Sequence, residues 1–317
     1  MSVYVLGSIN MDIVFECSRL PNKGETLKAK NFMMTSGGKG ANQAVACKKS
    51  GIDTYMLGSI GSDPLSKKNK QNLIDYCVNC SYLEELEKET SGIAGIIIEN
   101  GDNRIITYSG ANKSQNVDKI FNCIKNNMTA EDILLMQLEI PLDVVELALI
   151  EAKKKNITTV LNAAPVTDIP SSFYGNIDIL VVNETEFAQI TKTPPTSDVL
   201  IKEGSKKLID LGLEKVIVTL GENGSVLVTS NSYLYVPAYK VKVLDTTAAG
   251  DTFIGAYLAS FLQYKDDQKA LKYATAASAL TVQTLGAQIS IPTREQIDKF
   301  IKENGEIYEQ KKYNFRL

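Results

Sequence analysis

Asp245-Thr246-Thr247-Ala248-Ala249-Gly250-Asp251-Thr252-Phe253 is the stretch that says most about how this chain folds. A run of β-type residues over 239–244 precedes it. The residues after it have the spacing of an amphipathic helix, with apolar side chains at Phe253, Ala256, Tyr257 and Phe261. The small side chains of residues 248–250 would let backbone N–H groups approach an anion at the first helical turn, where the helix dipole also favours negative charge. The stretch therefore predicts a strand, an anion-binding turn and a helix.

An acidic residue, Asp251, falls in that same first turn. A carboxylate beside an anion site is electrostatically unfavourable unless it acts on the ligand. It would suit a general base that takes a proton from a hydroxyl group while the N–H groups hold negative charge. The simpler interpretation is an aspartate in the first turn of an ordinary helix, and this motif alone does not decide between the two.

The composition argues against several classes of protein. The chain has 317 residues, enough for one large α/β domain, and a formal net charge of −3. Its lysines are scattered rather than clustered, so neither nucleic acid nor a membrane surface is an expected partner. Because the sequence shows neither a signal-peptide pattern nor an apolar run of membrane-spanning length, we expect a cytoplasmic protein.

Histidine is absent from the chain, which narrows the possible chemistry. Without it there is no Ser-His or Cys-His nucleophile and no histidine metal ligand, so a general base must be a carboxylate, Lys, Cys or Tyr. Of the five cysteines, Cys77 and Cys80 have C-x-x-C spacing. No second pair completes a zinc site, so we interpret these two as structural or incidental.

Runs of β-type residues alternate with helical patterns along most of the chain. The predicted strands are 4–6, 54–57, 133–136, 158–161, 179–182 and 216–220. The predicted helices begin near residues 41, 64, 142 and 198. Strands that alternate with helices are typical of βαβ units, so the pattern predicts an α/β fold with a mostly parallel central sheet.

Two stretches interrupt this alternation. Residues 12–36 contain short β-type runs around a Pro-Asn-Lys-Gly turn, and residues 92–108 have the pattern of a hairpin with its turn at 100–103. We expect them to pair as one small β lid over the carboxyl ends of the strands, where ligands of open α/β sheets bind. With no linker or repeat in the sequence, residues 1–317 are predicted to form a single domain that carries this lid.

Polar residues follow several predicted strands. Asn10 and Asp12 follow the first one, where an amide and a carboxylate suit adjacent hydroxyls of a polyol, although a polar turn is the simpler interpretation. Glu139 follows 133–138 in the same way. The glycine-rich segment 36–44, with Lys39 and Asn42, has neither Walker A nor G-x-G-x-x-G spacing. It suggests either close backbone approach to a ligand or a flexible turn before a helix.

Two further segments have both a structural and a functional interpretation. Asn183 and Glu186 open a helix after 179–182, and acidic residues are common there. Functionally, Asn183 would lie near phosphate oxygens and Glu186 near Mg²⁺ through water, since Mg²⁺ keeps several of its waters. The Thr-Leu-Gly-Glu-Asn-Gly segment at 219–224 has the pattern of a hairpin turn, but its glycines would also let a nucleotide lie against the backbone.

With these motifs in view, the chain resembles the ribokinase family of carbohydrate and nucleoside kinases, which includes the minor phosphofructokinase. The likeness spans nearly the whole length and follows the family order through 7–12, 37–46, 135–139, 183–186, 219–224, 245–253 and 286–292. The resemblance implies a three-layer α/β/α domain with a β lid, and ATP-dependent phosphorylation of a sugar, ribose at its 5-hydroxyl.

The resemblance also implies a role for individual positions. Ribose would be bound by Asn10, Met11, Asp12, Gly38, Lys39, Gly40, Ala41, Asn42 and Glu139. Asp251 would be the base, in an anion hole made by Ala248, Ala249, Gly250 and Asp251. ATP, with Mg²⁺, would lie along Asn183, Glu186, Thr219, Leu220, Gly221, Glu222, Asn223, Gly224 and Gly250, with Thr275 near the adenine. A monovalent cation, K⁺, would be held by Asp245, Thr247, Thr281, Thr284, Gly286 and Ser290.

Three departures from the family pattern stand out. Ala248 lies where most of the family has glycine, Thr275 replaces an expected Asn or His, and the lid strands match less well. The alternatives are the same chemistry on 2-deoxyribose, a ketohexose phosphate or a nucleoside, and a sugar-binding regulator without catalysis. A dehydrogenase is disfavoured because no dinucleotide fingerprint follows a strand.

The lid strands also suggest a partner. Ile96, Ile98 and Ile106 indicate an apolar outer face on the lid, and such a sheet often needs a second surface to cover it. Ribokinases typically pair through this part of the fold. The resemblance therefore implies a homodimer.

Overall fold

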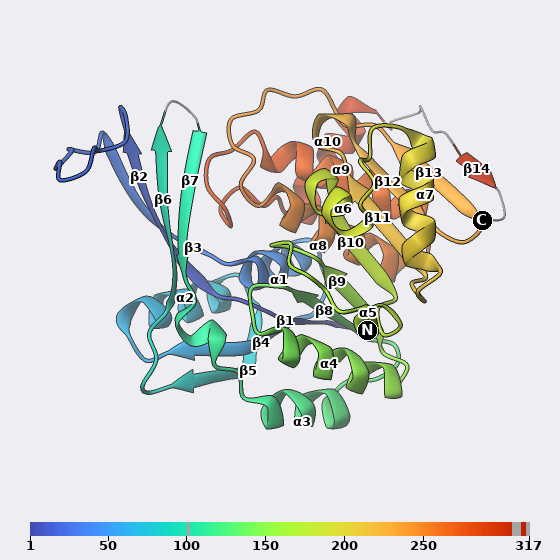
Figure 1. Cartoon of the computed structure of the whole chain (residues 1–317), viewed down its shortest axis with the longest axis horizontal. Helices are drawn as coiled ribbons and strands as arrows, with labels where there is room; N and C mark the ends of the chain where they lie inside the picture. Colours follow the sequence, from blue (N-terminus) through green and yellow to red (C-terminus); the bar gives the residue numbers. More distant parts are fainter. Residues whose placement is uncertain (100–101, 306–311, 315–317) are drawn as a thin grey trace.

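A computed structural model describes residues 1–99, 102–305 and 312–314 of the chain. Its largest element is a ten-stranded sheet in the order β14-β13-β12-β11-β10-β9-β8-β1-β4-β5 (Figure 1). In this spatial order, the seven strands β11, β10, β9, β8, β1, β4 and β5 are parallel to one another. Strands β12, β13 and β14 extend the β11 edge with antiparallel pairing. Their bounds are Val3–Leu6 (β1), Thr54–Gly61 (β4), Asn79–Leu86 (β5), Ile133–Gln137 (β8), Thr158–Asn162 (β9), Ile179–Asn183 (β10), Lys215–Thr219 (β11), Ser225–Val228 (β12), Ser232–Val236 (β13) and Lys312–Asn314 (β14).

Helices cover both faces of this sheet and give the three-layer α/β/α architecture that the sequence predicts. The alternation within β1 shows why: Val3 and Val5 belong to one buried cluster and Tyr4 and Leu6 to the other. The first cluster takes in α1 (Lys39–Lys49), α2 (Pro64–Asp75), α8 (Ala249–Tyr264), α9 (Asp267–Thr281) and α10 (Arg294–Asn304). The second takes in α3 (Val117–Asn127), α4 (Leu142–Lys154), α5 (Ser171–Tyr174), α6 (Glu184–Thr191) and α7 (Asp198–Ile209). No helix of the described chain has both the length and the apolar character needed to cross a bilayer.

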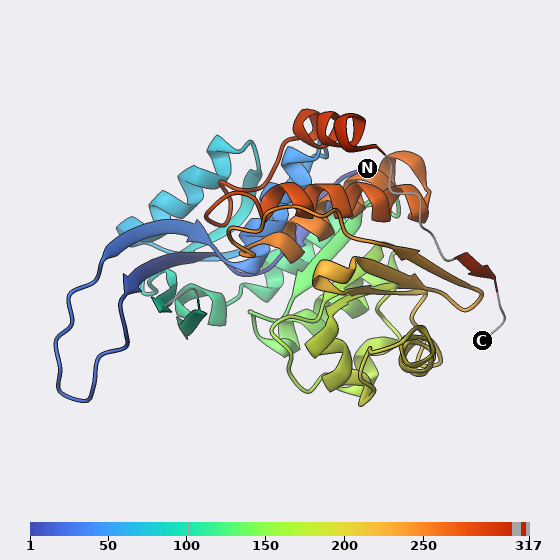
Figure 2. The same cartoon turned by 90° about the horizontal axis from the view of Figure 1, so that it is seen from above.

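A second, four-stranded sheet, named the small sheet below, projects from the main body (Figures 1 and 2). Its order is β3-β2-β6-β7, and its strands are Asn31–Gly37 (β3), Asn10–Cys17 (β2), Gly92–Glu99 (β6) and Asp102–Tyr108 (β7). Residues 100 and 101 of the predicted hairpin turn lie outside the described residues. Ile106 pairs with Gly95 and therefore lies on the opposite face from Ile96 and Ile98, so the single apolar face predicted from these three residues is wrong.

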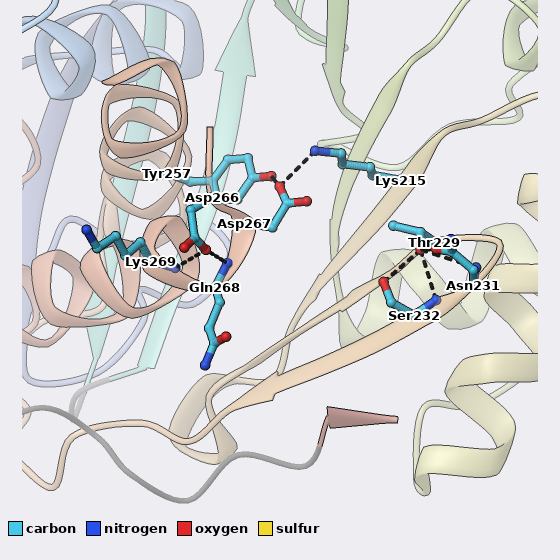
Figure 3. Close-up of polar contacts among 9 residues, drawn as sticks. All are labelled: Lys215, Thr229, Asn231, Ser232, Tyr257, Asp266, Asp267, Gln268 and Lys269. Carbon is cyan, nitrogen blue, oxygen red and sulfur yellow. Dashed lines mark hydrogen bonds and ion pairs between the residues drawn. The ribbon is translucent and has the colours of Figure 1, made fainter. Parts of the chain in front are cut away.

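Helix α8 is held in place by contacts of the segment before it and of its own middle turns. The predicted strand over 239–244 is wrong: this segment pairs with no strand among the described residues, and the N–H groups of Leu244 and Asp245 donate to the carbonyl of Val282. Further along α8, the Tyr257 hydroxyl donates to Asp267 at 2.6 Å, and Lys215 lies 2.8 Å from the same carboxylate (Figure 3). These contacts tie α8 to α9 and to β11.

Candidate active site

The carboxyl ends of neighbouring parallel strands meet the first turns of α1, α6 and α8. Four neighbouring strands, β8 to β11, each end in a polar residue: Gln137, Asn162, Asn183 and Thr219. A cleft of about 210 Å³ opens here. It is lined by Lys39, Asn162, Ala164, Val181, Val182, Asn183, Glu186, Thr219, Thr246, Ala248, Gly250, Asp251 and Ile254.

The first turn of α8 presents backbone N–H groups to this cleft. Ala248 adopts the left-handed conformation (φ 61°), and within the described chain no side chain caps the helix. A Cβ added to Gly250 would meet nothing within 4 Å, so the cleft is open at that residue. The structure therefore brings Ala248, Gly250 and Asp251 to the cleft wall. Ala249 is not among the lining residues, and its N–H donates to the carbonyl of Thr246 at 3.2 Å.

The Asp251 carboxylate is buried and held by two amides of α1. Asn42 Nδ2 donates to Oδ2 at 3.0 Å and Gln43 Nε2 donates to Oδ1 at 2.8 Å. One turn further along both helices, a Cβ added to Gly255 would lie 2.4 Å from the Cβ of Ala46. Glycine at 255 is therefore what lets α1 and α8 approach closely enough for these two hydrogen bonds.

Asn10, Asp12 and Glu139 are not among the lining residues, but Glu139 contacts Lys39, which is, and the charges of Glu139 and Asp251 act on Asp12. The Asn10 side chain accepts a hydrogen bond from Asn112 at 2.7 Å. Glu139 Oε2 accepts from the Ser8 hydroxyl at 2.5 Å and from the Lys39 N–H at 3.1 Å. The Asp12 carboxylate accepts no hydrogen bond from any residue that the structure describes. Burial, then the charges of Glu139 and Asp251, raises the pKa of Asp12 to about 7.

Other residues of the predicted sugar site have mainly packing roles. Met11 is fully buried on the face of β2 opposite to Asn10 and Asp12. The glycine-rich segment lies against the chain itself: a Cβ on Gly38 would be 2.7 Å from the Asn10 N, and one on Gly40 would be 2.6 Å from the Gly7 carbonyl carbon. Ala41 is buried and donates its N–H to Ser8. The glycines are needed to seat α1 against the end of β1.

Lys39 is the basic residue of the cleft. Its ammonium makes no ion pair within 4 Å in the described part of the chain. Burial lowers the pKa of Lys39, but the charges of Asp251, Glu139 and Glu186 outweigh that effect and raise the pKa above its usual value. The cleft thus holds one cation among several carboxylates.

Of the predicted nucleotide residues, Asn183, Glu186, Thr219 and Gly250 line the cleft, and residues 220–224 and Thr275 do not. Asn183 and Glu186 form a reciprocal capping box, each side chain accepting from the other residue's backbone N–H at 2.8 Å. Both residues also line the cleft together with Thr219. Burial raises the pKa of Glu186, although the Asn183 N–H and the Lys39 charge oppose it. Asn183 and Glu186 therefore cap helix α6, as the sequence suggested, and they also face the cleft.

The 219–224 segment is a tight turn with one open glycine. Leu220 is buried and its N–H donates to the Gly224 carbonyl, whereas Glu222 and Asn223 are exposed. A Cβ on Gly224 would lie 2.1 Å from the Val236 carbonyl oxygen, while one on Gly221 would meet only Glu184, at 3.9 Å. Of the two glycines, only Gly221 leaves room above its Cα.

Thr275 is not brought to the cleft wall. It is buried in α9, and its hydroxyl donates to the Leu271 carbonyl at 2.8 Å. Ser225, next to the turn, lies 3.5 Å from the same hydroxyl. Thr275 therefore packs behind the 219–224 segment.

The predicted cation residues gather only in part. Asp245 accepts from the N–H and hydroxyl of Thr247 at 2.9 and 2.6 Å, and from the Gly286 N–H at 2.9 Å. Partial burial raises the pKa of Asp245, but these hydrogen bonds outweigh it and leave that pKa below its usual value. The Ser290 hydroxyl donates to Ala287 and that of Thr281 to Ala277, while Thr284 is exposed. Across the described residues no group of three or more His, Cys, Asp or Glu forms a metal cluster.

Sequence reasoning missed several polar residues of this region. Asn162 is the last residue of β9, just as Glu139 comes after β8. Polar residues at the ends of parallel strands converge, so the same reasoning predicts Asn162 at this site. Gln43 follows Asn42 in the glycine-rich segment, and no sequence motif marks it. Ser8 and Asn112 each support a residue that the sequence did single out, whereas Gln137 supports Gln43, which it did not.

Comparisons with known proteins identify the class. The model of the pfkB family of carbohydrate kinases matches residues 1–294, and the chain belongs to this family. It is 34% identical over 311 residues to a deoxyribokinase of Salmonella typhi, covering 96% of this chain and 100% of that one. It is 37% identical over 310 residues to a ribokinase of Schizosaccharomyces pombe, covering 94% of this chain and 97% of the relative.

A solved structure shares the fold. The structure of Arabidopsis thaliana ribokinase complexed with ribose and ATP superposes with a TM-score of 0.87 at 33% identity. The match covers 95% of this chain and 98% of that one. The predicted ribokinase-like α/β/α fold is confirmed.

Proposed function

We propose that this chain is an ATP-dependent kinase that phosphorylates D-ribose at its 5-hydroxyl to give ribose 5-phosphate. The observation that carries the proposal is the placement of Asp251, a buried carboxylate oriented by two amides at the uncapped first turn of α8. Asp251 lines the cleft together with Asn183 and Thr219, and its charge also acts on Asp12. The ribokinase relatives, and the complex of one of them with ribose and ATP, support the choice of substrates.

The chemistry that such a site performs is positioning and charge stabilisation. Asp251 accepts the proton of the sugar hydroxyl as the hydroxyl oxygen bonds to the γ-phosphorus of ATP and the bond to ADP breaks. The N–H groups at the start of α8, with the dipole of that helix, stabilise the negative charge on the transferred phosphoryl group. The Lys39 ammonium, free of ion pairs in the described structure, adds a positive charge to the same cleft.

The sugar is recognised by groups that still have hydrogen-bonding capacity. Ser8 and the Lys39 N–H both donate to Oε2 of Glu139, which leaves Oε1 for a sugar hydroxyl. Asp12 is uncommitted, and the Asn10 side chain retains its amide donors. Two carboxylates and an amide suit the neutral vicinal hydroxyls of ribose and would repel a sugar that already carries a phosphate.

ATP lies along Asn183, Thr219 and the open backbone at Gly221 in this proposal. The acidic cleft fits a nucleotide carried with Mg²⁺, which Glu186 would approach through water; bound Mg²⁺ would neutralise phosphate charge. Asp245, Thr247, Gly286 and Ser290 supply carboxylate, hydroxyl and carbonyl oxygens, the donor types that a hard cation such as K⁺ prefers. Held there, K⁺ would order the turn that begins α8. Because the reaction consumes ATP, we place the protein in the cytoplasm.

The small sheet serves in this proposal as a lid on a single kinase domain, with residues 12–36 and 92–108 as its two contributions. Asp12 and Asn10 come from its base, so closing the sheet over the cleft would complete the sugar site. Its other face carries large exposed apolar side chains: Phe15, Phe32, Ile106 and Tyr108. A second copy of the chain would cover this face and make a homodimer.

A sugar panel tests the proposed function. ADP release would be measured with ATP and Mg²⁺ for ribose, 2-deoxyribose, fructose 6-phosphate and a nucleoside, with ³¹P NMR of the product. We expect ribose to have the highest kcat/KM. The Salmonella relative makes 2-deoxyribose the second candidate, and a higher kcat/KM for that sugar would change the substrate while leaving the mechanism intact. Sugar binding without ADP release would indicate a regulator and contradict the proposal.

A further inference from the structure

Gln43 is a buried residue with an exposed fraction of 0% that touches the base but cannot touch a ligand in the cleft. It follows Asn42 on α1, and the two side chains reach one carboxylate, Asn42 at Oδ2 and Gln43 at Oδ1 of Asp251. Asn42 is itself held by Gln288, whose Nε2 donates to the Asn42 Oδ1 at 3.1 Å. Asn42 is 6% exposed and Gln43 0%, so of the two donors Gln43 is the one that no ligand can reach.

The surroundings of Gln43 leave its amide one orientation. An ionised carboxylate only accepts hydrogen bonds, so the nitrogen of Gln43 must face Asp251. Its second hydrogen goes to Asn162 Oδ1 at 3.0 Å, and its oxygen accepts from Gln137 Nε2 at 2.6 Å. Asn162 is oriented in turn by donating to the Val181 carbonyl at 3.1 Å. Reversing the amide would put oxygen against oxygen at Asp251 and at Asn162.

Gln137 donates to Gln43 but leaves one of its own polar atoms without a partner in the described structure. Its side chain is fully buried, and Oε1 has no hydrogen-bond partner within 1–99, 102–305 and 312–314. The amide fits only because residue 7 is glycine, since a Cβ there would lie 1.9 Å from that oxygen. An unpaired buried amide oxygen is destabilising, and an apolar residue would fill the same volume without that loss. What the amide provides is the donor to Gln43.

We propose that Gln43 is the residue that positions the base, and that Gln137 acts only through Gln43. This inference rests on the proposed function, in which Asp251 takes the proton. Holding Oδ1 and Oδ2 by separate donors fixes the rotation of the carboxylate as well as its place. A general base must be aligned with the hydroxyl that it deprotonates, so loss of one donor lowers kcat while the binding of ribose and ATP is retained.

The first test is Gln43→Met, which keeps the length of the side chain and removes its amide. We expect kcat to fall by about 10- to 100-fold, because a small misalignment of a catalytic group has an effect of that order. The Kd values for ribose and for ATP, measured by calorimetry, should stay within about threefold, the pattern of an interaction used in the transition state. Thr159→Val is the matched control: it removes a fully buried polar group bonded to Asp178, away from the cleft, and should leave kcat unchanged.

Three further variants separate positioning from a general loss of structure. Gln137→Met should lower kcat less than Gln43→Met, and the double variant should be no slower than Gln43→Met alone, because residues that act through one contact are not additive. Gln43→Glu puts a second carboxylate beside Asp251, in a region whose other charged groups are Asp12, Glu139, Glu186 and Lys39. Adjacent carboxylates resist ionising together, so the acidic limb of the kcat–pH profile should move to higher pH.

The results that would overturn the inference are distinct from those that would overturn the proposed function. A folded Gln43→Met protein with kcat within about twofold of wild type contradicts the inference alone, provided Asp251→Asn is inactive. Fully additive losses in the double variant also contradict it. Normal turnover by Asp251→Asn would remove the proposed function and the inference together. If Gln43→Met does not fold, kcat of Gln137→Met decides: an unchanged value refutes the role of the network, and a reduced one at unchanged Kd supports it.

Discussion

Replacing Asp12 by asparagine should make the ligand-free protein more stable and a poorer enzyme. Burial and the nearby charges of Glu139 and Asp251 raise the pKa of this carboxyl to about 7 from the ordinary 3.8. Between these two pH values the folded protein binds a proton that the unfolded chain has lost, so stability decreases as the pH rises through this window. Above pH 7 the charged side chain costs the folded state at most about 4 kcal/mol, from a difference of about three pKa units.

The assay is thermal or urea unfolding of Asp12→Asn and wild type, without ligands, at pH 4.5 and at pH 8. The variant should gain about 2 to 4 kcal/mol at pH 8 and under about 1 kcal/mol at pH 4.5, where wild-type Asp12 is largely protonated. Ribose affinity should fall by about 10- to 100-fold, since a hydrogen bond to a charged group is lost. No gain at pH 8, or an equal gain at both pH values, would refute the electrostatic reasoning, because neither outcome follows from a raised carboxyl pKa.

Three further predictions concern elements around the cleft. K⁺ should raise activity above that in a large organic cation at matched ionic strength, and Asp245→Ala should reduce that difference in a coupled ADP assay; equal rates in both buffers would argue against the cation site. Gly255→Ala, whose new Cβ would lie 2.4 Å from Ala46, should destabilise the protein by about 1 to 3 kcal/mol and lower kcat by separating α1 from α8; a stable variant with normal kcat would show that this close packing is unimportant. Ile106 is 74% exposed on the small sheet, and Ile106→Glu should be a monomer in analytical ultracentrifugation, whereas wild type should be a dimer. The control Leu147→Glu, on α4, should remain a dimer, and a monomeric wild type would contradict the proposed homodimer.

Much of the site could be predicted because parallel strands end at one edge of a sheet. Glu139 and Asn183 are far apart in the sequence, yet each follows an apolar strand; Asn183 lines the cleft, and Glu139 contacts the cleft residue Lys39. Asp12 lies within β2 of the small sheet, and its carboxyl interacts with the charges of Glu139 and Asp251. Asp251 could be placed by the same reasoning because small residues precede it at a helix start. These features depend on local pattern and strand order, which a sequence displays directly.

What could not be predicted depends on side-chain packing between elements. The glycines at 38 and 40 suggested ligand approach, but the space above them is filled by the backbone of Gly7 to Asn10. The β-type run over 239–244 forms no strand because its end is held by the Val282 carbonyl instead of a neighbouring strand. Gln43 and Gln137 have no motif of their own, and their roles appear only once α1, α8 and β8 are packed together.

The most direct test of the central claim is the turnover of ribose by Asp251→Asn compared with wild type, with the Kd of ribose and ATP measured on the same preparations. We expect wild type to convert ribose and ATP to ribose 5-phosphate and ADP, and the variant to bind both substrates while losing about 10²- to 10⁴-fold in kcat. Near-normal turnover by the folded variant, or a wild-type protein that binds ribose and ATP without forming ribose 5-phosphate, would contradict the account.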